Sequence, residues 1–177
     1  MAPRPVVTYG NLALKRRASE IEIIDESVKK LAAEMFEILE RSRGVGLAAP
    51  QIGVSLRLIV LSIPRDDGTR WKCAVVNPEF VAKRGKARSE EGCLSIPGIC
   101  EEITRAEEVE IKGLDLDGKE MRIGGKGLLA RAVQHELDHL DGILIVDRLS
   151  TAKRHVLQKQ LRKLEENTKR GAGRQAG

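Results

Sequence analysis

Residues 135–139 read His-Glu-Leu-Asp-His, and the helix expected to carry them determines both the chemistry and the architecture predicted for this chain. On a helix, residues four apart differ by roughly 40° in direction and about 6 Å along the axis, so both imidazoles can bind one divalent ion. Glu136 lies beside them, where a carboxylate can take a proton from ion-bound water, as in metal-dependent hydrolases. With 3 histidines in 177 residues, a chance match has a probability on the order of half a percent. A metal site is therefore favoured over two hydrogen-bonded histidines without a ligand role.

The residues around this pattern predict a buried helix over residues 127–141. Apolar side chains occur on more than one side of it: Leu128, Leu129, Ala132, Val133, Leu137 and Leu140. Gly142 stands where a left-handed residue commonly ends a helix. Low solvent access keeps imidazoles neutral and strengthens the effect of an ion on its water, so a buried helix suits catalysis.

Cysteine is the preferred source of a third ligand. The chain has three cysteines, Cys73, Cys93 and Cys100, without Cys-x-x-Cys spacing, and the odd number argues against a disulfide framework. Cys93 lies in Glu-Gly-Cys-Leu-Ser, residues 91–95, where Gly92 permits a turn that presents the thiolate. One thiolate and two imidazoles would leave a fourth tetrahedral position open, as a catalytic site requires. Cys73 and Cys100 are expected to serve packing.

A downstream carboxylate is the alternative third ligand, and the candidates are Glu165 and Glu166. They lie in a run dense with lysine and arginine, residues 159–170, which is typical of a solvated helix face. His155 is placed similarly and is also expected to face solvent.

A third segment marked by glycine, Gly-Val-Gly-Leu-Ala-Ala-Pro-Gln, occupies residues 44–51. It fits the dinucleotide-binding fingerprint only superficially, because helical periodicity precedes it over residues 26–42 and Pro50 hinders a helix within it. Without side chains, the backbone at its two glycines can approach a ligand closely, and Gln51 offers an amide donor for a developing oxyanion. A purely structural turn is the alternative.

Together with Gln-His-Glu-Leu-Asp-His, residues 134–139, the segments at 44–51 and 91–95 resemble, in order and spacing, the three signature motifs of the peptide deformylases. The resemblance extends from about Val6 to about Leu164. It implies a metal-dependent hydrolase that removes the formyl group from the N-terminal methionine of nascent bacterial proteins and releases formate.

The resemblance also implies a role for each site residue by its position. The implied metal ligands are Cys93, His135 and His139. Glu136 would act as general base and then as general acid, while the Gln51 amide and the Leu94 backbone N–H would stabilise the oxyanion. The chemistry of these groups agrees with those roles.

Peptide deformylases bind their peptide as an added strand along the first and second motifs, with the methionine side chain in an apolar pocket beside the metal. The substrate-binding residues implied here are Val45, Gly46, Glu91, Leu128 and Ala132. Glu91 is expected to orient the region by hydrogen bonding, with a plain surface carboxylate as the alternative. Some bacterial relatives carry arginine where this chain has Cys100, so one contact to the substrate backbone is expected to differ.

One divalent metal ion is the implied cofactor. A thiolate with two imidazoles suits Fe(II), Zn, Ni or Co, and the resemblance favours Fe(II). A metal-binding protein without turnover is disfavoured, because a base and oxyanion donors accompany the ligands.

The order of elements predicts an α+β fold, with mostly antiparallel strands packed around a central metal-binding helix and a further C-terminal helix, which is also the fold of the resembling family. Helices are expected over residues 11–17, 26–42, 127–141 and 152–167. Strands are expected over residues 56–63, 71–76, 80–83, 101–112, 119–123 and 143–146. The predicted organisation is a catalytic domain over residues 1–150, an amphipathic basic helix over 151–167 and a disordered tail over 168–177.

The net charge of +5 and the isoelectric point of about 9.2 raise the possibility of an RNA-binding module. Direct base recognition is disfavoured, since one Trp, one Tyr and two Phe provide few stacking surfaces. A ribosome contact through the basic C-terminal helix is retained as a hypothesis. Apolar runs are far shorter than the ~20 residues of a membrane span. Residues 1–5 lack the apolar segment of a secretory signal, and the cysteines are expected to be free, so a cytoplasmic location is favoured.

Overall fold

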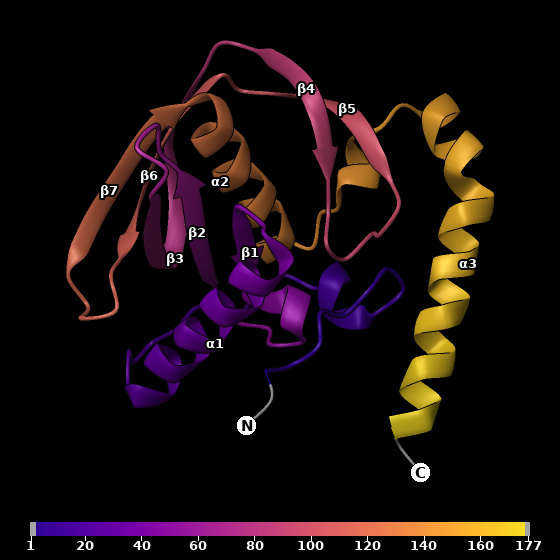
Figure 1. Cartoon of the computed structure of the whole chain (residues 1–177), viewed down its shortest axis with the longest axis horizontal. Coiled ribbons are helices and arrows are strands. Elements are labelled where there is room, and N and C mark those ends of the chain that lie inside the picture. Colours follow the sequence, from indigo (N-terminus) through magenta and orange to yellow (C-terminus); the bar gives the residue numbers. More distant parts are fainter. Residues whose placement is uncertain (1–2, 176–177) are drawn as a thin grey trace.

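The computed structural model describes residues 3–175 and shows an α+β fold (Figure 1). Within that range the α-helices are α1 (Glu26–Ser42), α2 (Gly127–Leu140) and α3 (Thr151–Gln175). The strands are β1 (Gly46–Ala48), β2 (Leu58–Pro64), β3 (Arg70–Arg84), β4 (Ala87–Gly92), β5 (Cys100–Arg105), β6 (Glu108–Leu114) and β7 (Glu120–Lys126). The short 3-10 helices are η1 (Leu12–Lys15), η2 (Ala49–Ile52) and η3 (Ile145–Arg148).

Five strands form one antiparallel sheet in the order β1-β2-β3-β6-β7, and β4 and β5 form a separate hairpin. The sheet is covered on both faces. Leu58 and Val60 of β2 pack in one core cluster with Met35 of α1, while Ile59 and Leu61 pack in another with α2. Successive side chains of a strand point to opposite faces, so the continuous apolar run of β2 follows from its position between two helices.

The helix that carries the His-Glu-Leu-Asp-His pattern is buried, as predicted. Its buried side chains include Val133, Leu137 and Leu140, which pack against the sheet. Gly142 follows its end with φ of +73°, and a Cβ there would lie 2.8 Å from the backbone of Lys15. Glycine is therefore required at this turn both by conformation and by space.

Several sequence-based boundaries differ from the structure. The segment 143–146, expected as a strand, instead enters η3, because the Asp147 carboxylate accepts from the Leu144 N–H at 3.0 Å and closes a turn. The expected strand 101–112 is divided at Ala106 into β5 and β6, and the two expected strands 71–76 and 80–83 form one irregular strand, β3. Two strands were not predicted: β1 has three residues, and β4 is highly polar.

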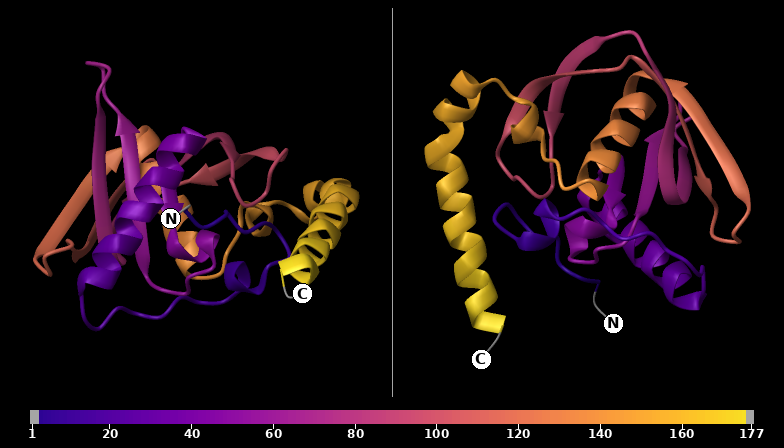
Figure 2. Two further views of the ribbon diagram at one scale, coloured as in Figure 1. Left: turned by 60° about the horizontal axis from the view of Figure 1, so that its bottom comes forward. Right: turned by 180° about the vertical axis from the view of Figure 1, so that it is seen from behind.

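The C-terminal helix α3 lies beside the body of the protein, apart from the five-stranded sheet (Figures 1 and 2). Leu157, Leu161 and Leu164 pack in a cluster with Ile96 and Ile99, which belong to the segment between β4 and β5. None of the helices in the described range is both long enough and apolar enough to cross a membrane.

The expectation of a disordered tail from residue 168 is corrected by the extent of α3, which continues to Gln175. The Thr168 hydroxyl donates to the Tyr9 carbonyl oxygen at 2.8 Å and ties this part of the helix to the N-terminal segment. Residues 176 and 177, also assigned to that tail, lie outside the described part of the chain.

Candidate active site

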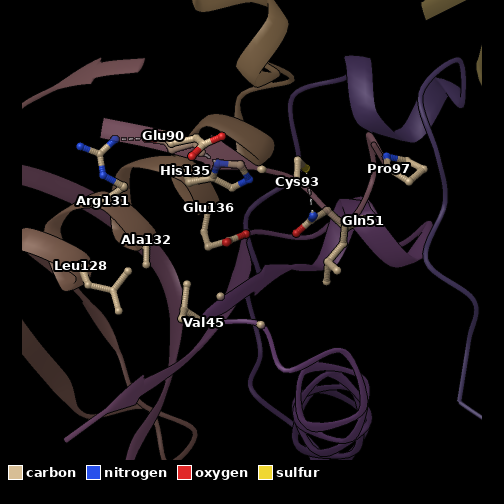
Figure 3. A pocket seen from close by; sticks show the side chains of 15 residues that line it. Val45, Gln51, Glu90, Cys93, Pro97, Leu128, Arg131, Ala132, His135 and Glu136 are labelled. Atoms are coloured by element: carbon tan, nitrogen blue, oxygen red, sulfur yellow. Dashed lines mark hydrogen bonds and ion pairs between the residues drawn. The ribbon is translucent and has the colours of Figure 1, made fainter. Parts of the chain in front are cut away.

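Three potential metal ligands from two distant segments of the chain converge at one point. Figure 3 shows two of them, Cys93 and His135, beside Glu136. The Cys93 Sγ lies 3.2 Å from the Nε2 of His139, which lies 3.2 Å from the Nε2 of His135. All three donor atoms are within 4.8 Å of one another. The structure therefore brings together the residues that the sequence motifs predicted as ligands.

These distances fit a tetrahedral ion. With nitrogen ligands at ~2.0–2.1 Å and sulfur at ~2.3 Å, neighbouring donors of a tetrahedral site are separated by about 3.3–3.6 Å. The two distances from His139 Nε2, to Cys93 Sγ and to His135 Nε2, are close to that, and the third pair lies within 4.8 Å. His135 Nδ1 faces the Glu91 carboxylate at 3.2 Å, so its Nε2 can direct a lone pair at the same point. The donor set is thus suited to one divalent ion.

The two histidines have opposite pKa shifts. Burial lowers the pKa of His139 well below its usual value, which keeps that imidazole neutral as a ligand must be. Burial also acts to lower the pKa of His135, but hydrogen bonds with Cys93 and Glu91 outweigh it and raise the pKa to about 10. Metal binding at this site is therefore expected to release a proton from His135.

Glu136 is 3% exposed and faces the cavity between α2 and β1 (Figure 3). Within residues 3–175, its Oε2 has no hydrogen-bond partner. Burial raises its pKa to about 7, against the opposing effect of His135 and Arg105. A carboxyl group with a pKa near neutrality can both accept and return a proton, which is the requirement for general acid–base catalysis.

Gly46 makes room for this carboxylate. A Cβ at Gly46 would lie 2.4 Å from the Glu136 Oε1, far inside van der Waals contact. The sequence suggested that glycine here allows a ligand to approach the backbone; the structure shows that Glu136 itself makes the close approach.

The side-chain amide of Gln51 is oriented by the backbone. Its Oε1 accepts from the Ala48 N–H at 2.8 Å, so its Nε2 is directed toward Cys93 Sγ at 3.7 Å and Ser95 Oγ at 3.5 Å. The donor end of this amide therefore faces the candidate metal centre (Figure 3).

Glu91 is buried behind His135 and is not a surface carboxylate. Its Oε1 accepts from Arg105 Nε and Arg131 Nη1, both at 2.6 Å, and its Oε2 accepts from Arg105 Nη2 at 2.9 Å. Burial acts to raise its pKa, but hydrogen bonds from His135 and Arg105 outweigh it and lower the pKa to about 2. The charged carboxylate therefore fixes the orientation of the His135 ring.

A cavity of about 450 Å³ opens over these groups, a size typical of small-ligand sites. The sequence-predicted residues that line it are Val45, Gly46, Gln51, Glu91, Cys93, Leu94, Leu128, Ala132, His135 and Glu136. His139 is absent from its wall because it is only 1% exposed. The predicted pocket residues thus surround a single space next to the three candidate ligands.

Some residues of the site were not found from the sequence. Arg131 lines the cavity. It precedes His135 by four residues, so both lie on one face of the helix, and this spacing could have indicated Arg131 as a site residue. Arg105 has no such signal: the register of β4 and β5 places it opposite Ala87, and its side chain meets Glu91 only in the folded structure.

The alternative ligands lie elsewhere. Glu165 and Glu166 are on α3, where Glu165 pairs with Lys169 at 3.0 Å, and His155 on the same helix is exposed, as expected. Cys73 is partly buried, and burial raises its pKa to about 11. Cys100 is exposed, so the packing role expected for it is wrong.

Comparison with known proteins agrees with the motifs. The sequence model of the polypeptide deformylase family matches residues 3–155. The chain belongs to the peptide deformylase family. A peptide deformylase of Thermomicrobium roseum is 48% identical over 153 residues, covering 84% of this chain and 87% of that protein.

Solved structures of peptide deformylases share the fold. The crystal structure of a peptide deformylase from Legionella pneumophila has a TM-score of 0.83 and 43% identity, covering 98% of this chain and 99% of that one. That of a peptide deformylase from Thermus thermophilus has a TM-score of 0.85 and 37% identity, covering 93% and 99%. As a member of this family, the chain is a metal-dependent hydrolase that removes the N-formyl group from the N-terminal methionine of nascent proteins and releases formate.

Substitution of Gly46 by alanine is expected to displace the Glu136 carboxylate, since its Cβ would lie only 2.4 Å from Oε1. Misplacement of a catalytic group by about 1 Å can cost on the order of 10²-fold in rate. Hydrolysis of a formylmethionyl peptide by Gly46→Ala should fall by about that factor, with the circular dichroism spectrum retained. Gly124→Ala in β7 is the matched control, because the nearest atom to its Cβ would lie at 3.7 Å. Equal activities of the two variants would contradict this role of Gly46.

Proposed function

We propose that Cys93, His135 and His139 bind the catalytic ion of this deformylase and that Glu136 transfers the protons of the reaction. The observation that carries the proposal is the convergence of Sγ and two Nε2 atoms beside a buried carboxylate with an unpartnered oxygen in the described structure. When bound, a divalent ion supplies Lewis-acid chemistry, lowering the pKa of water and stabilising negative charge on oxygen. The remaining steps fall to the side chains of the protein.

Glu136 would act first as a base, taking a proton from the water that attacks the formyl carbon. The same carboxyl would then return that proton to the departing nitrogen, so that formate and a free amine leave. Its unpartnered oxygen and its pKa near neutrality support both steps.

Gln51 and the Leu94 backbone N–H would stabilise the negative charge that develops on the formyl oxygen. The amide of Gln51 supports this role, because the Ala48 N–H holds its oxygen and leaves its Nε2 donor toward the cavity. Such a preoriented donor does not need to reorganise as charge develops.

Substrate binding is assigned to Val45, Gly46, Glu91, Leu128 and Ala132. Val45, Leu128 and Ala132 offer apolar contacts in the cavity for the methionine side chain. Within the described residues β1 pairs only with β2, and β4 only with β5, so each has a free edge beside the cavity along which a peptide can add as a strand. Glu91 would contribute through His135, whose ring it orients.

We further propose that the native ion is Fe(II). A thiolate with two imidazoles also suits Zn, Ni and Co, and the family resemblance is the support for iron. Catalysis would take place in the cytoplasm, where thiols such as Cys93 and the exposed Cys100 remain reduced.

Replacing Glu136 by glutamine or alanine should remove proton transfer but leave the ligand atoms in place. Loss of general acid–base catalysis typically costs about 10²- to 10⁴-fold in rate. Steady-state hydrolysis of a formylmethionyl peptide should fall by that amount while elemental analysis still finds one ion per chain. Glu37→Gln on the exposed face of α1 serves as control. Full activity of either Glu136 variant would refute the assigned base.

Purification without oxygen should yield iron, and exposure to air should inactivate the enzyme as the iron or Cys93 oxidises. Elemental analysis and activity are measured on the same preparation before and after air exposure. An anaerobic preparation that contains only zinc and keeps full turnover in air would contradict the assignment of Fe(II).

The ribosome is proposed as a partner of α3. This helix lies beside the body of the enzyme (Figures 1 and 2), and its exposed face carries cations without ion-pair partners in the described structure. They are Lys159, Arg162, Lys163 and Arg170. Such a face can attract ribosomal RNA phosphates without base recognition.

Replacing Lys159, Arg162 and Lys163 by glutamine should weaken cosedimentation with ribosomes. The slope of log binding constant against log salt concentration should decrease in magnitude by roughly one unit per cation removed. Substitution is sharper than truncation after Leu149, which would also remove Leu157, Leu161 and Leu164 from the core. A variant with Lys30, Arg65 and Lys86 changed to glutamine is the charge-matched control. Unchanged, salt-sensitive cosedimentation of the α3 variant would exclude this contact.

A further inference from the structure

Arg105 on β5 joins two buried carboxylates behind the candidate metal centre. Its side chain is 2% exposed. Its Nε and Nη2 donate to the two oxygens of Glu91 at 2.6 and 2.9 Å, and its Nη1 donates to Asp138 Oδ2 at 2.8 Å. Arg105 neither lines the cavity nor offers a ligand atom. Apart from the effect of its charge on the pKa of Glu136, its connection to the site therefore runs through these two carboxylates.

Each carboxylate belongs to a segment that carries metal ligands. Glu91 precedes Cys93 by two residues, and its Oε2 faces His135 Nδ1 at 3.2 Å. Asp138 directly precedes His139 on α2. The guanidinium thus connects the hairpin that leads to the cysteine with the helix that bears both histidines.

We propose that Arg105 is a positioning residue: its fork fixes Glu91 and Asp138 relative to each other and thereby holds Cys93, His135 and His139 in one geometry. This inference rests on the metal ligands proposed above.

Stability alone does not account for such a group. Replacing a buried ion pair by apolar residues is often neutral or stabilising. A guanidinium differs in its rigid planar fork, which bonds two acceptors in defined directions. Arg131 and Arg148 also approach this cluster, but Arg131 contacts only Glu91 of the two carboxylates, and Arg148 only Asp138. Arg105 alone, among the described residues, bridges both.

Arg105→Lys tests the proposal, because lysine keeps the charge and loses the fork. Arg57→Lys is the matched control. Arg57 is also buried, with 8% side-chain exposure, and is also tied to the end of α2, through Asp141 Oδ1 at 2.8 Å. It contacts neither Glu91 nor Asp138. A merely structural role predicts the same behaviour of the two variants.

Both full-length proteins are loaded with Co(II), whose visible spectrum reports thiolate and imidazole coordination. Cobalt release into excess chelator is timed well below the measured Tm of each variant. Loss of a group that supports metal ligands typically costs about 10- to 100-fold in metal affinity or activity. Arg105→Lys should release cobalt faster by about that factor, with an altered spectrum. Its kcat should fall while KM is unchanged, since Arg105 does not reach the cavity.

Arg57→Lys should keep the wild-type spectrum and release rate. Unchanged release and spectrum in folded Arg105→Lys, or equal acceleration in both variants, would overturn the inference.

If Arg105→Lys does not fold, Asp138→Asn replaces it, because this substitution weakens one end of the bridge. Faster cobalt release supports the inference, and wild-type release overturns it. If wild-type protein shows no thiolate-to-cobalt band, the proposed metal centre fails; a normal wild-type band with unaffected variants removes only the role of Arg105.

Discussion

The packing of α2 against the five-stranded sheet is the interaction on which the rest of the structure depends, because this helix supplies both core contacts and site residues. One side places Val133, Leu137 and Leu140 in the core, and the other presents His135 and Glu136 to the cavity. Burial of these apolar side chains stabilises the fold and offsets the free-energy cost of burying the polar groups of the site. The chemistry of the site is thus held in position by the hydrophobic core beneath it.

Burial sets the protonation properties of the site, and neighbouring charges then make its groups differ. Glu136 and Glu91 are both buried carboxyls close to the same histidine. Glu136 has no hydrogen-bond partner on one oxygen in the described structure, and its pKa rises to about 7. Burial also acts to raise the pKa of Glu91, but hydrogen bonds from His135 and Arg105 outweigh it and lower the pKa to about 2. Opposite shifts allow one carboxyl to exchange protons while the other remains a fixed charge.

Much of this architecture could be predicted from the sequence wherever the determinant is local. The bounds of α1 and the left-handed glycine after α2 follow from periodicity and from the conformational freedom of glycine. The candidate ligands were predicted from motifs. What could not be predicted depends on tertiary contacts: β4 is too polar to be recognised as a strand alone, and the Arg105 side chain meets Glu91 only in the folded structure. The close approach of Gly46 to Glu136 is likewise tertiary.

The two sheets meet at the cavity, and the three candidate ligands come from both sides of this junction. Cys93 extends from the small hairpin of β4 and β5, whereas both histidines belong to the helix packed on the large sheet. An ion bound by all three would cross-link two layers that have no strand pairing between them in the described structure. A ligand that binds only the folded state adds to stability by mass action. The catalytic ion would therefore also stabilise the tertiary structure. Its removal would stop the reaction and loosen the walls of the cavity.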